Sequence, residues 1–174
     1  MNKLVEELNY LTLSVKDTSE DDKNETIFLD KLLIDCMSEF KLRAEKEKRD
    51  IYIKVIPENA KIVSNYNKIQ RIIVNLIGNA FKYSPSGTKI EIVAEIKNQE
   101  LSISIIDEGC GIKEEEIDNI FKRLYRVEAS RNMKTGGYGL GLAIAKQLAL
   151  QINGDILVES EYGKGSKFTL KINC

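Results

Sequence analysis

The apolar positions of the first twenty residues follow the spacing of a helix that packs against another helix. Leu4, Leu8, Leu11 and Val15 recur at the a and d positions of a heptad pattern, which ends at the acidic segment 17–22. Two heptads are too few for an isolated coiled coil to be stable. This segment is therefore predicted to be the end of a longer helical element.

The next stretch of the chain predicts a helix, a strand and a second helix. Apolar side chains return every three or four residues from Phe28 towards Arg49, which indicates an amphipathic helix. Apolar and polar residues then alternate over residues 51–55, as in a strand, and Pro57 ends this pattern. A second helix with an apolar face is predicted from about residue 67 to residue 83.

The remaining chain predicts two antiparallel hairpins and two further helices. The four alternating runs lie at residues 90–94, 101–105, 156–158 and 168–172. A short helix is predicted around residues 117–121, and a longer one from about residue 138 to residue 151. Helices and mostly antiparallel strands that do not alternate strictly predict an α+β fold, a two-layer α/β sandwich.

The length and the composition indicate one globular domain with a short appendage. The chain has 174 residues, of which 43% are hydrophobic and 30% are charged, so global disorder is excluded. Its net charge of −1 removes the electrostatic case for binding nucleic acid or an anionic membrane surface. No apolar run approaches the ~18 residues of a spanning helix, so we expect no direct membrane insertion.

The chain contains no histidine, and this absence excludes several kinds of site within it. His-based zinc sites, Ser-His-Asp triads and histidine general bases all need that side chain. Cys36, Cys110 and Cys174 are odd in number and share no CxxC spacing, which indicates free thiols in a reducing cytosol. We therefore expect a cytoplasmic location.

The helix predicted at residues 67–83 has a polar face with an unusual composition. Asn75, Asn79 and Lys82 fall on this face, and Tyr83 closes the last turn. Asparagine is a mediocre helix former, so two on one face need an explanation. Either the face is simply solvated, or two amide oxygens and one ammonium group converge on a phosphate bound to Mg²⁺.

Two glycine-rich segments offer a second set of binding features. Asp107 follows a predicted strand and precedes Gly109 and Gly111, where the backbone can approach a flat ligand or simply turn. If buried, this carboxylate can accept a hydrogen bond from an amino group such as that of adenine. The run at residues 136–142 directly precedes an apolar-periodic helix, and such a loop presents backbone N–H groups to phosphates. Neither a Rossmann fingerprint nor a Walker A loop is present.

Taken together, these segments resemble the ATP-binding catalytic domain of sensor histidine kinases, in the Bergerat-fold ATPase and kinase superfamily (the GHKL superfamily). Five segments resemble, in order, the N box (75–83), the first glycine box (107–112), the F box (120–126), the second glycine box (137–142) and the final glycine/threonine motif (163–166). The ordered set covers roughly residues 65–170, and the resemblance extends more loosely to residue 25.

The resemblance implies a role for each residue of the phosphate and metal end of such a site. Asn79 would be the main Mg²⁺ ligand with Asn75 beside it, and Lys82 and Arg126 would face the phosphates of ATP. The backbone along the triphosphate would be that of Gly137, Gly139, Leu140 and Gly141. Asn75, Lys82 and Arg126 are the residues expected to take part in catalysis.

The resemblance also implies an adenine pocket and a lid. The residues implied around the base are Tyr83, Asp107, Gly109, Gly111, Ile112 and Ser166, with Asp107 reading the amino group. Residues from about 113 to 138 would form the ATP lid, anchored by Phe121. Leu124 replaces an aromatic residue that is usual in the family, and Tyr138 stands where a small residue is common.

Position 75 distinguishes between branches of the superfamily. The relatives that hydrolyse ATP carry a glutamate four residues before the metal asparagine, where it activates water. Asn75 is an amide and cannot take a proton at neutral pH. Transfer to a neutral imidazole, which is already a nucleophile, needs no such base. The resemblance therefore implies phosphoryl transfer from Mg-ATP to a histidine.

That histidine would lie on a dimerisation domain outside this chain. Residues 1–20 resemble the C-terminal end of a dimerisation helix, and residues 21–174 would be the catalytic and ATP-binding domain. The expected partners are ATP, the dimerisation and histidine-phosphotransfer domain of the same parent protein, and a response regulator. Membrane anchoring of the parent stays open, as does a second hypothesis: a nucleotide-sensing or scaffold module without phosphotransfer.

Overall fold

A five-stranded sheet forms one layer of the molecule, with strand order β2–β4–β5–β7–β6. In this order the strands are β2 (Asp50–Ile56), β4 (Lys89–Lys97), β5 (Glu100–Asp107), β7 (Gly165–Asn173) and β6 (Gly154–Glu161). Strand β2 runs parallel to β4, and all other neighbours in this sheet are antiparallel. The computed structural model describes residues 23–126 and 139–173.

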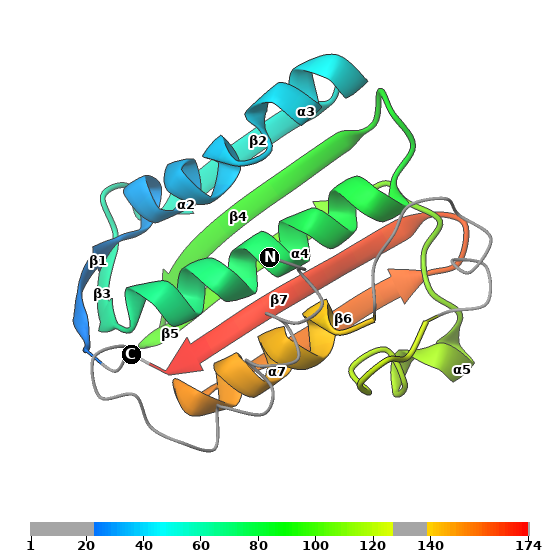
Figure 1. The fold of residues 1–174 in the computed structure, drawn as a ribbon. Coiled ribbons are helices and arrows are strands. Elements are labelled where there is room, and N and C mark those ends of the chain that lie inside the picture. Colours follow the sequence, from blue (N-terminus) through cyan, green and yellow to red (C-terminus); the bar gives the residue numbers. More distant parts are fainter. Residues whose placement is uncertain (1–22, 127–138, 174) are drawn as a thin grey trace, which may run out of the picture.

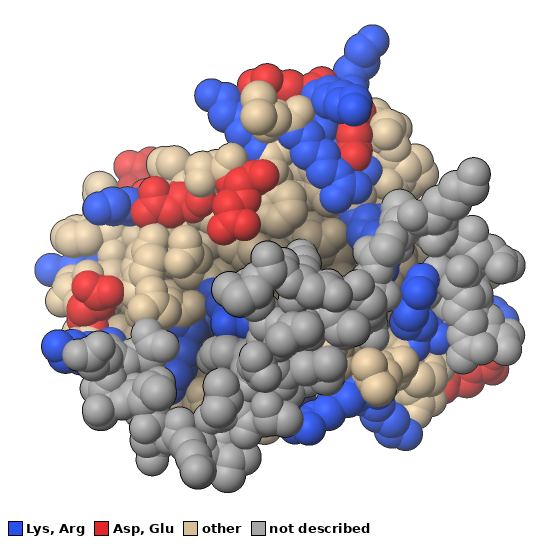
Figure 2. Space-filling view, viewed as in Figure 1, with Lys and Arg blue, Asp and Glu red and all other residues tan. Residues whose placement is uncertain are grey.

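The second layer consists of helices that all lie on one face of this sheet (Figure 1). They are α2 (Leu29–Ser38), α3 (Lys41–Glu47), α4 (Tyr66–Tyr83) and α7 (Gly141–Gln151). Helices α4 and α7 pack side by side over the central and β6 side of the sheet. Basic and acidic side chains are interspersed over the visible part of this face (Figure 2), in keeping with the net charge of −1.

The core lies between the two layers because each contributes its apolar side. The apolar face of α4 is buried along its whole length, from Ile69 to Phe81. On β4, Ile90, Ile92 and Ala94 are fully buried, while the residues between them are partly exposed. This alternation is that of a sheet with only one covered face. The predicted two-layer α+β sandwich is therefore confirmed.

Several predicted elements are confirmed in position and type. The strand predicted at 51–55 is β2, and the helix predicted at 67–83 is α4. The two predicted hairpins are the antiparallel pairs β4–β5 and β6–β7. The long last helix is confirmed as α7, although it begins at Gly141 and not near residue 138.

The single helix predicted from Phe28 towards Arg49 is wrong in two respects. Phe28 belongs to strand β1 (Glu25–Phe28), which pairs with β3 (Lys61–Ser64), and its side chain is 52% exposed. The helix is also interrupted at Phe40, whose ring stacks on that of Phe81 with 5.1 Å between centroids. This tertiary contact has no local sequence signal, and the four-residue strands β1 and β3 are too short to show a period.

The short helix predicted around residues 117–121 lies earlier in the chain. Helix α5 spans Glu114–Ile117, and Ile120 is buried in the turns that follow it. The predicted helix at the N-terminus, Cys174, and lid residues 127–138, with Gly137 and Tyr138, lie outside the described residues. Among the described helices, none combines the length and the apolar character needed to cross a bilayer.

Candidate functional site

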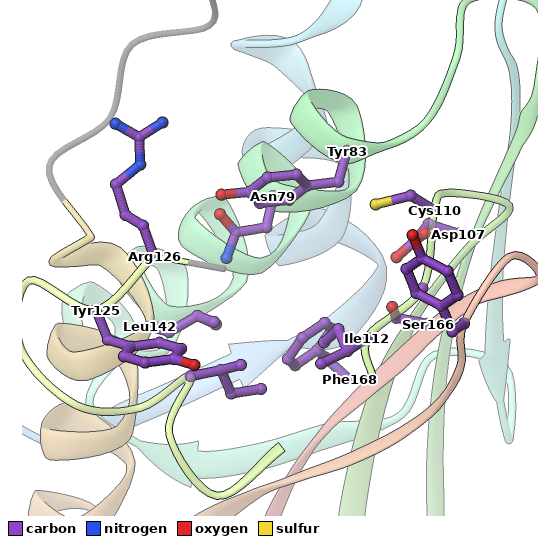
Figure 3. A pocket seen from close by; sticks show the side chains of 13 residues that line it. Asn79, Tyr83, Asp107, Cys110, Ile112, Tyr125, Arg126, Leu142, Ser166 and Phe168 are labelled. Carbon is purple, nitrogen blue, oxygen red and sulfur yellow. The ribbon is translucent and has the colours of Figure 1, made fainter. Parts of the chain in front are cut away.

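The predicted motifs converge on one pocket at the ends of α4, β5 and β7 (Figure 3). Its lining residues are Asn79, Tyr83, Asp107, Cys110, Gly111, Ile112, Ile120, Tyr125, Arg126, Leu142, Tyr162, Ser166 and Phe168. Asp107, Cys110 and Ser166 lie at one end, and Tyr125, Arg126 and Leu142 at the other, with Asn79 and Tyr83 between them. The pocket thus has an acidic end and a cationic end.

Asp107 is the buried acid of this pocket, with only 7% of its surface exposed. It ends β5 opposite Ser166 of β7. One carboxylate oxygen accepts hydrogen bonds from the Gly109 N–H at 2.8 Å and from the Ser84 hydroxyl at 3.4 Å. Burial raises the pKa of this carboxyl, and the N–H groups of Gly109 and Ser166 and the Ser84 hydroxyl offset part of that rise.

The two glycines of the predicted first glycine box are required by close backbone contacts. A side chain at Gly109 would come within 2.6 Å of the Asp107 carboxylate and 2.8 Å of the Tyr83 carbonyl oxygen. Gly111 has a φ of +64°, and a side chain there would overlap the Glu161 carbonyl. Both positions therefore let the loop pack closely against the end of α4 and the end of β6.

This loop is fixed at both ends by hydrogen bonds to neighbouring elements. The Cys110 N–H donates to the Tyr83 carbonyl oxygen at 3.2 Å, which joins the loop to the end of α4. The Ile112 N–H donates to the Ser160 hydroxyl oxygen at 2.9 Å, and that hydroxyl lies 3.0 Å from the Ser166 hydroxyl. The acid, the loop and Ser166 therefore form one connected wall.

The start of α7 forms the opposite end of the site. Leu140 is the N-cap of this helix, and no side chain caps it among the described residues. The first N–H groups of a helix have no partner within the helix and carry partial positive charge. The predicted residues Gly139, Leu140 and Gly141 therefore present a helix N-terminus beside the pocket, although they do not line it.

Asn75 and Lys82, two further predicted residues, lie beside the pocket and do not line it. The Asn75 amide donates to the Arg71 carbonyl oxygen at 2.9 Å, and its own oxygen faces Gly141 of α7. The Lys82 ammonium lies 4.9 Å from the centre of the Tyr83 ring. Asn75 therefore links α4 to the start of α7.

The predicted F box reaches the pocket through the residues on either side of Phe121. Ile120 and Tyr125 line the pocket, whereas Phe121 packs outside it under the Lys146 ammonium, 5.1 Å from the ring centre. The Leu124 N–H donates to the Gly139 carbonyl oxygen at 3.1 Å, and the Leu124 side chain is 64% exposed. The F box is thus bonded to the segment that opens α7.

Six lining residues were not predicted as site residues, and they are mostly apolar. They are Cys110, Ile120, Tyr125, Leu142, Tyr162 and Phe168. Phe168 could have been found, because it lies two residues after Ser166 on the same side of a strand. Cys110 could have been found from its place between Gly109 and Gly111, the glycines of the predicted first glycine box. Tyr162 follows β6 and has no signal in the sequence.

A family model described as "Histidine kinase-, DNA gyrase B-, and HSP90-like ATPase" matches residues 64–174. The histidine protein kinase SaeS of Staphylococcus epidermidis is 42% identical over 150 residues, which cover 85% of this chain and 43% of that protein. The chain therefore spans less than half the length of the curated relatives that it matches.

Two solved histidine kinase structures share the fold. Histidine kinase AdeS of Acinetobacter baumannii superposes with a TM-score of 0.79 and is 26% identical, covering 98% of this chain and 77% of that one. Histidine kinase ThkA, solved in complex with the response regulator protein TrrA, has a TM-score of 0.80 at 20% identity. That match covers 98% of this chain and 47% of ThkA.

Proposed function

The chain belongs to the histidine kinase-, DNA gyrase B- and HSP90-like ATPase family, and we propose that it is the ATP-binding catalytic domain of a two-component sensor histidine kinase. The observation that carries this proposal is the polarity of the pocket. A buried carboxylate, Asp107, lies at one end, and Arg126 and the start of α7 lie at the other. The Asp107 end suits an adenine base, and the Arg126 end suits a triphosphate.

The acidic end fits a purine base. Ile112, Phe168 and Tyr83 supply flat and apolar surface, and Asp107 supplies the acceptor for an exocyclic amino group. A guanine presents a carbonyl oxygen at that position, and this oxygen would face a carboxylate. The site therefore prefers adenine to guanine on electrostatic grounds.

The other end fits a triphosphate with Mg²⁺. Among the described residues, no group of three acidic or cysteine side chains could enclose a metal ion. Asn79 lines the pocket, and Mg²⁺ is usually held by one or two protein oxygens, waters and substrate phosphates. Asn79 would hold the metal, with Asn75 beside it, and the metal would neutralise charge on the phosphates.

The chain's own residues favour phosphoryl transfer over hydrolysis. Asn75 cannot accept a proton, so no base at this position activates water. Arg126 and Lys82 would hold the phosphate oxygens, and the N-terminus of α7 would add its N–H groups. Catalysis would consist of positioning and of neutralising charge as the phosphoryl group leaves.

We also propose the partners and the location. The acceptor would be a histidine on a dimerisation domain of the same parent protein, because this chain has none. ThkA, a structural neighbour, was solved with a response regulator, and a response regulator is the partner proposed here for the parent. The free thiols Cys36 and Cys110 suit a reducing cytoplasm.

Calorimetric titration with ATP, with and without Mg²⁺, tests this function. The native chain should bind ATP more tightly when Mg²⁺ is present. Asn79→Ala should remove most of the Mg²⁺ effect, because it deletes the proposed metal ligand. Equal affinity of this variant and the native chain for Mg-ATP would overturn the metal assignment, and no ATP binding by the native chain would overturn the function.

A further inference from the structure

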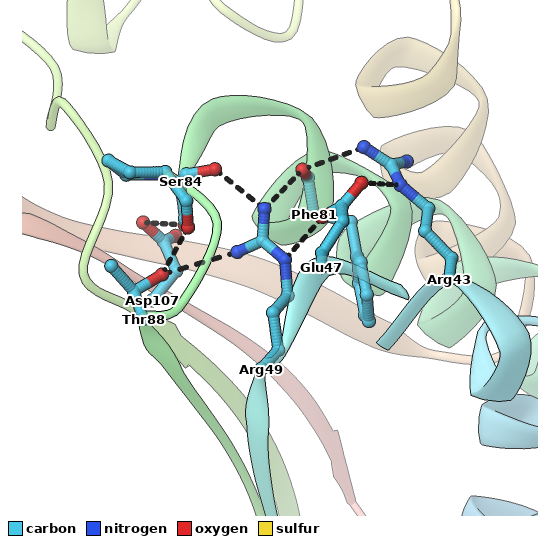
Figure 4. Close-up of polar contacts among 8 residues, drawn as sticks. Arg43, Glu47, Arg49, Phe81, Ser84, Thr88 and Asp107 are labelled. Atoms are coloured by element: carbon cyan, nitrogen blue, oxygen red, sulfur yellow. Dashed lines mark hydrogen bonds and ion pairs between the residues drawn. The ribbon is translucent and has the colours of Figure 1, made fainter. Parts of the chain in front are cut away.

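Arg49 is a buried guanidinium that lies outside the nucleotide pocket. Its side chain is only 2% exposed, and it lies in the short segment between α3 and β2 (Figure 4). A buried arginine is costly unless its donors are paired. The partners of Arg49 therefore indicate what it does.

Each nitrogen of the Arg49 guanidinium has a partner. Nη2 donates to the carbonyl oxygens of Phe81 at 3.0 Å and Ser84 at 2.7 Å. Nη1 donates to the Thr88 hydroxyl oxygen at 3.2 Å, and Nε donates to Glu47 at 2.6 Å. The guanidinium carbon also lies 5.0 Å from the centre of the Phe81 ring. The side chain is thereby held in one position.

Two of these partners lie at the C-terminal end of α4. The last carbonyl groups of a helix have no partner within the helix and carry partial negative charge. Arg49 satisfies two carbonyls there, one on each side of Lys82 and Tyr83. It therefore fixes the turn in which α4 presents Tyr83 to the pocket.

The same turn leads directly to the adenine end of the pocket. The Ser84 hydroxyl donates to the Asp107 carboxylate at 3.4 Å, and the Tyr83 carbonyl accepts from the Cys110 N–H at 3.2 Å. Arg49 Nη2 donates to the Ser84 carbonyl oxygen at 2.7 Å and so fixes the backbone of this turn. A shift of this turn would therefore move both the Ser84 hydroxyl, which donates to Asp107, and the first glycine loop.

We propose that Arg49 is a positioning residue for the adenine pocket, acting through the Ser84 turn on Asp107 and Tyr83. This inference rests on the proposed function, because it concerns how the same site recognises its base. Arg49 touches neither the base nor the phosphates. Its effect is on the alignment of the groups that distinguish adenine from guanine.

Arg43 is a matched control within the same cluster. It also donates to the Phe81 carbonyl oxygen at 3.0 Å, pairs with Glu47 at 2.6 Å and lies over the Phe81 ring at 5.3 Å. Its side chain is 43% exposed, and in the described contacts it does not reach Ser84. Both arginines contact Phe81 and Glu47, but in the described contacts Arg49 alone reaches Ser84 and Thr88, and it is the more deeply buried of the two.

The experiment compares Arg49→Met with Arg43→Met by calorimetric titration of ATP and of GTP. Arg49→Met should weaken ATP binding at least tenfold and reduce the ratio of ATP to GTP affinity, while Arg43→Met should change both less than twofold. A role in folding alone would lower the melting temperature and leave that ratio unchanged. An unchanged ratio in folded Arg49→Met would overturn the proposal.

Ser84→Ala keeps the test decisive if Arg49→Met does not fold. This variant removes the hydroxyl that reaches Asp107 and leaves the buried charge of Arg49 with its backbone partners. It should reduce the ratio of ATP to GTP affinity, and an unchanged ratio would sink the proposal. Failure of the native chain to bind ATP would instead be a failure of the proposed function.

Discussion

The buried carboxylate of Asp107 is unfavourable for the stability of the fold but favourable for binding. It is almost fully buried, and burial raises its pKa, so the folded chain disfavours the charged form. The Gly109 N–H and the Ser84 hydroxyl reduce this penalty without removing it. A buried carboxylate with spare acceptor capacity is useful once an amino group reaches it, because the new hydrogen bond is charge-assisted.

Replacing this acid should therefore weaken nucleotide binding. A hydrogen bond to a charged group contributes about 1.5–3 kcal/mol, so Asp107→Ala should weaken ATP roughly ten- to a hundredfold. GTP, which presents no amino group at that position, should be affected much less. Titration of both nucleotides measures the two effects, and equal affinity of the native chain for ATP and GTP would contradict this role.

The same residue should leave a signature in the dependence of stability on pH. Because the pKa of Asp107 is raised in the folded chain, the folded chain binds its proton more tightly than the unfolded chain does. Stability is therefore lost as pH rises from about 3.9, the ordinary aspartate pKa, through the raised value. Asp107→Asn has no such group, so its stability relative to the native chain should increase over this window and then level off.

Denaturant unfolding of both chains from pH 3.5 to pH 8, without nucleotide, measures that difference. A difference that stays constant across this range would show that Asp107 keeps an ordinary pKa in the folded chain.

At the scale of single residues, polar chemistry was easier to predict than the pocket's apolar walls. Asn79, Asp107 and Ser166 stand out in the sequence, because polar residues and glycines interrupt an apolar pattern there. Tyr162 has no comparable signal in the sequence, and only the fold shows that it lines the pocket. Apolar lining residues are determined by tertiary contacts, which one sequence does not record.

At the scale of elements, α4 and α7 contact each other at the proposed phosphate end of the site. There the proposed metal ligands of α4 lie near the N-terminus of α7. Asn75 on α4 faces Gly141, the first residue of α7. A side chain at Gly141 would come within 2.9 Å of the Asn75 amide oxygen, which is closer than side-chain carbons approach. Gly78 lies one turn further on α4, where the nearest atom would be 3.8 Å away on Phe40.

These two glycines should respond differently to alanine. Gly78→Ala fits the available space and should stabilise the fold by about 0.5–1 kcal/mol, because alanine favours the helix, with ATP affinity unchanged. Gly141→Ala should displace the Asn75 amide and weaken Mg-ATP severalfold while the chain stays folded. Melting temperatures and titrations of the two variants decide the matter, and equal ATP affinities would argue against a functional contact between α4 and α7.

Helices and strands could be predicted from the sequence where the periodic pattern of apolar residues was long enough. The eighteen residues of α4 and the two hairpins repeat their pattern several times, and each was predicted correctly. The interruption between α2 and α3 depends on Phe40 stacking against Phe81, forty-one positions later in the chain. The short strands β1 and β3 are stabilised by each other, so neither is visible alone.

At the scale of the whole molecule, the chain carries the proposed donor site without an acceptor. It has no histidine, and its match to the kinase SaeS covers 43% of that protein. Its described residues nevertheless form a complete two-layer core and the wall of the pocket. Binding of ATP and transfer of its phosphoryl group should therefore be separable by supplying the acceptor on another fragment.

The isolated chain should bind ATP, form no phosphohistidine on itself and hydrolyse ATP at a negligible rate, because Asn75 is no base for water. Mixed at high concentration with a dimerisation fragment that carries the acceptor histidine, it should transfer label from γ-labelled ATP to that fragment. Arg126→Ala should reduce this transfer more than it reduces ATP binding, if Arg126 meets charge that develops only in the transition state. Rapid ATP turnover by the isolated chain would move it to the hydrolysing branch of its family. Absence of transfer even to a covalently tethered fragment would favour a nucleotide-sensing module over a kinase.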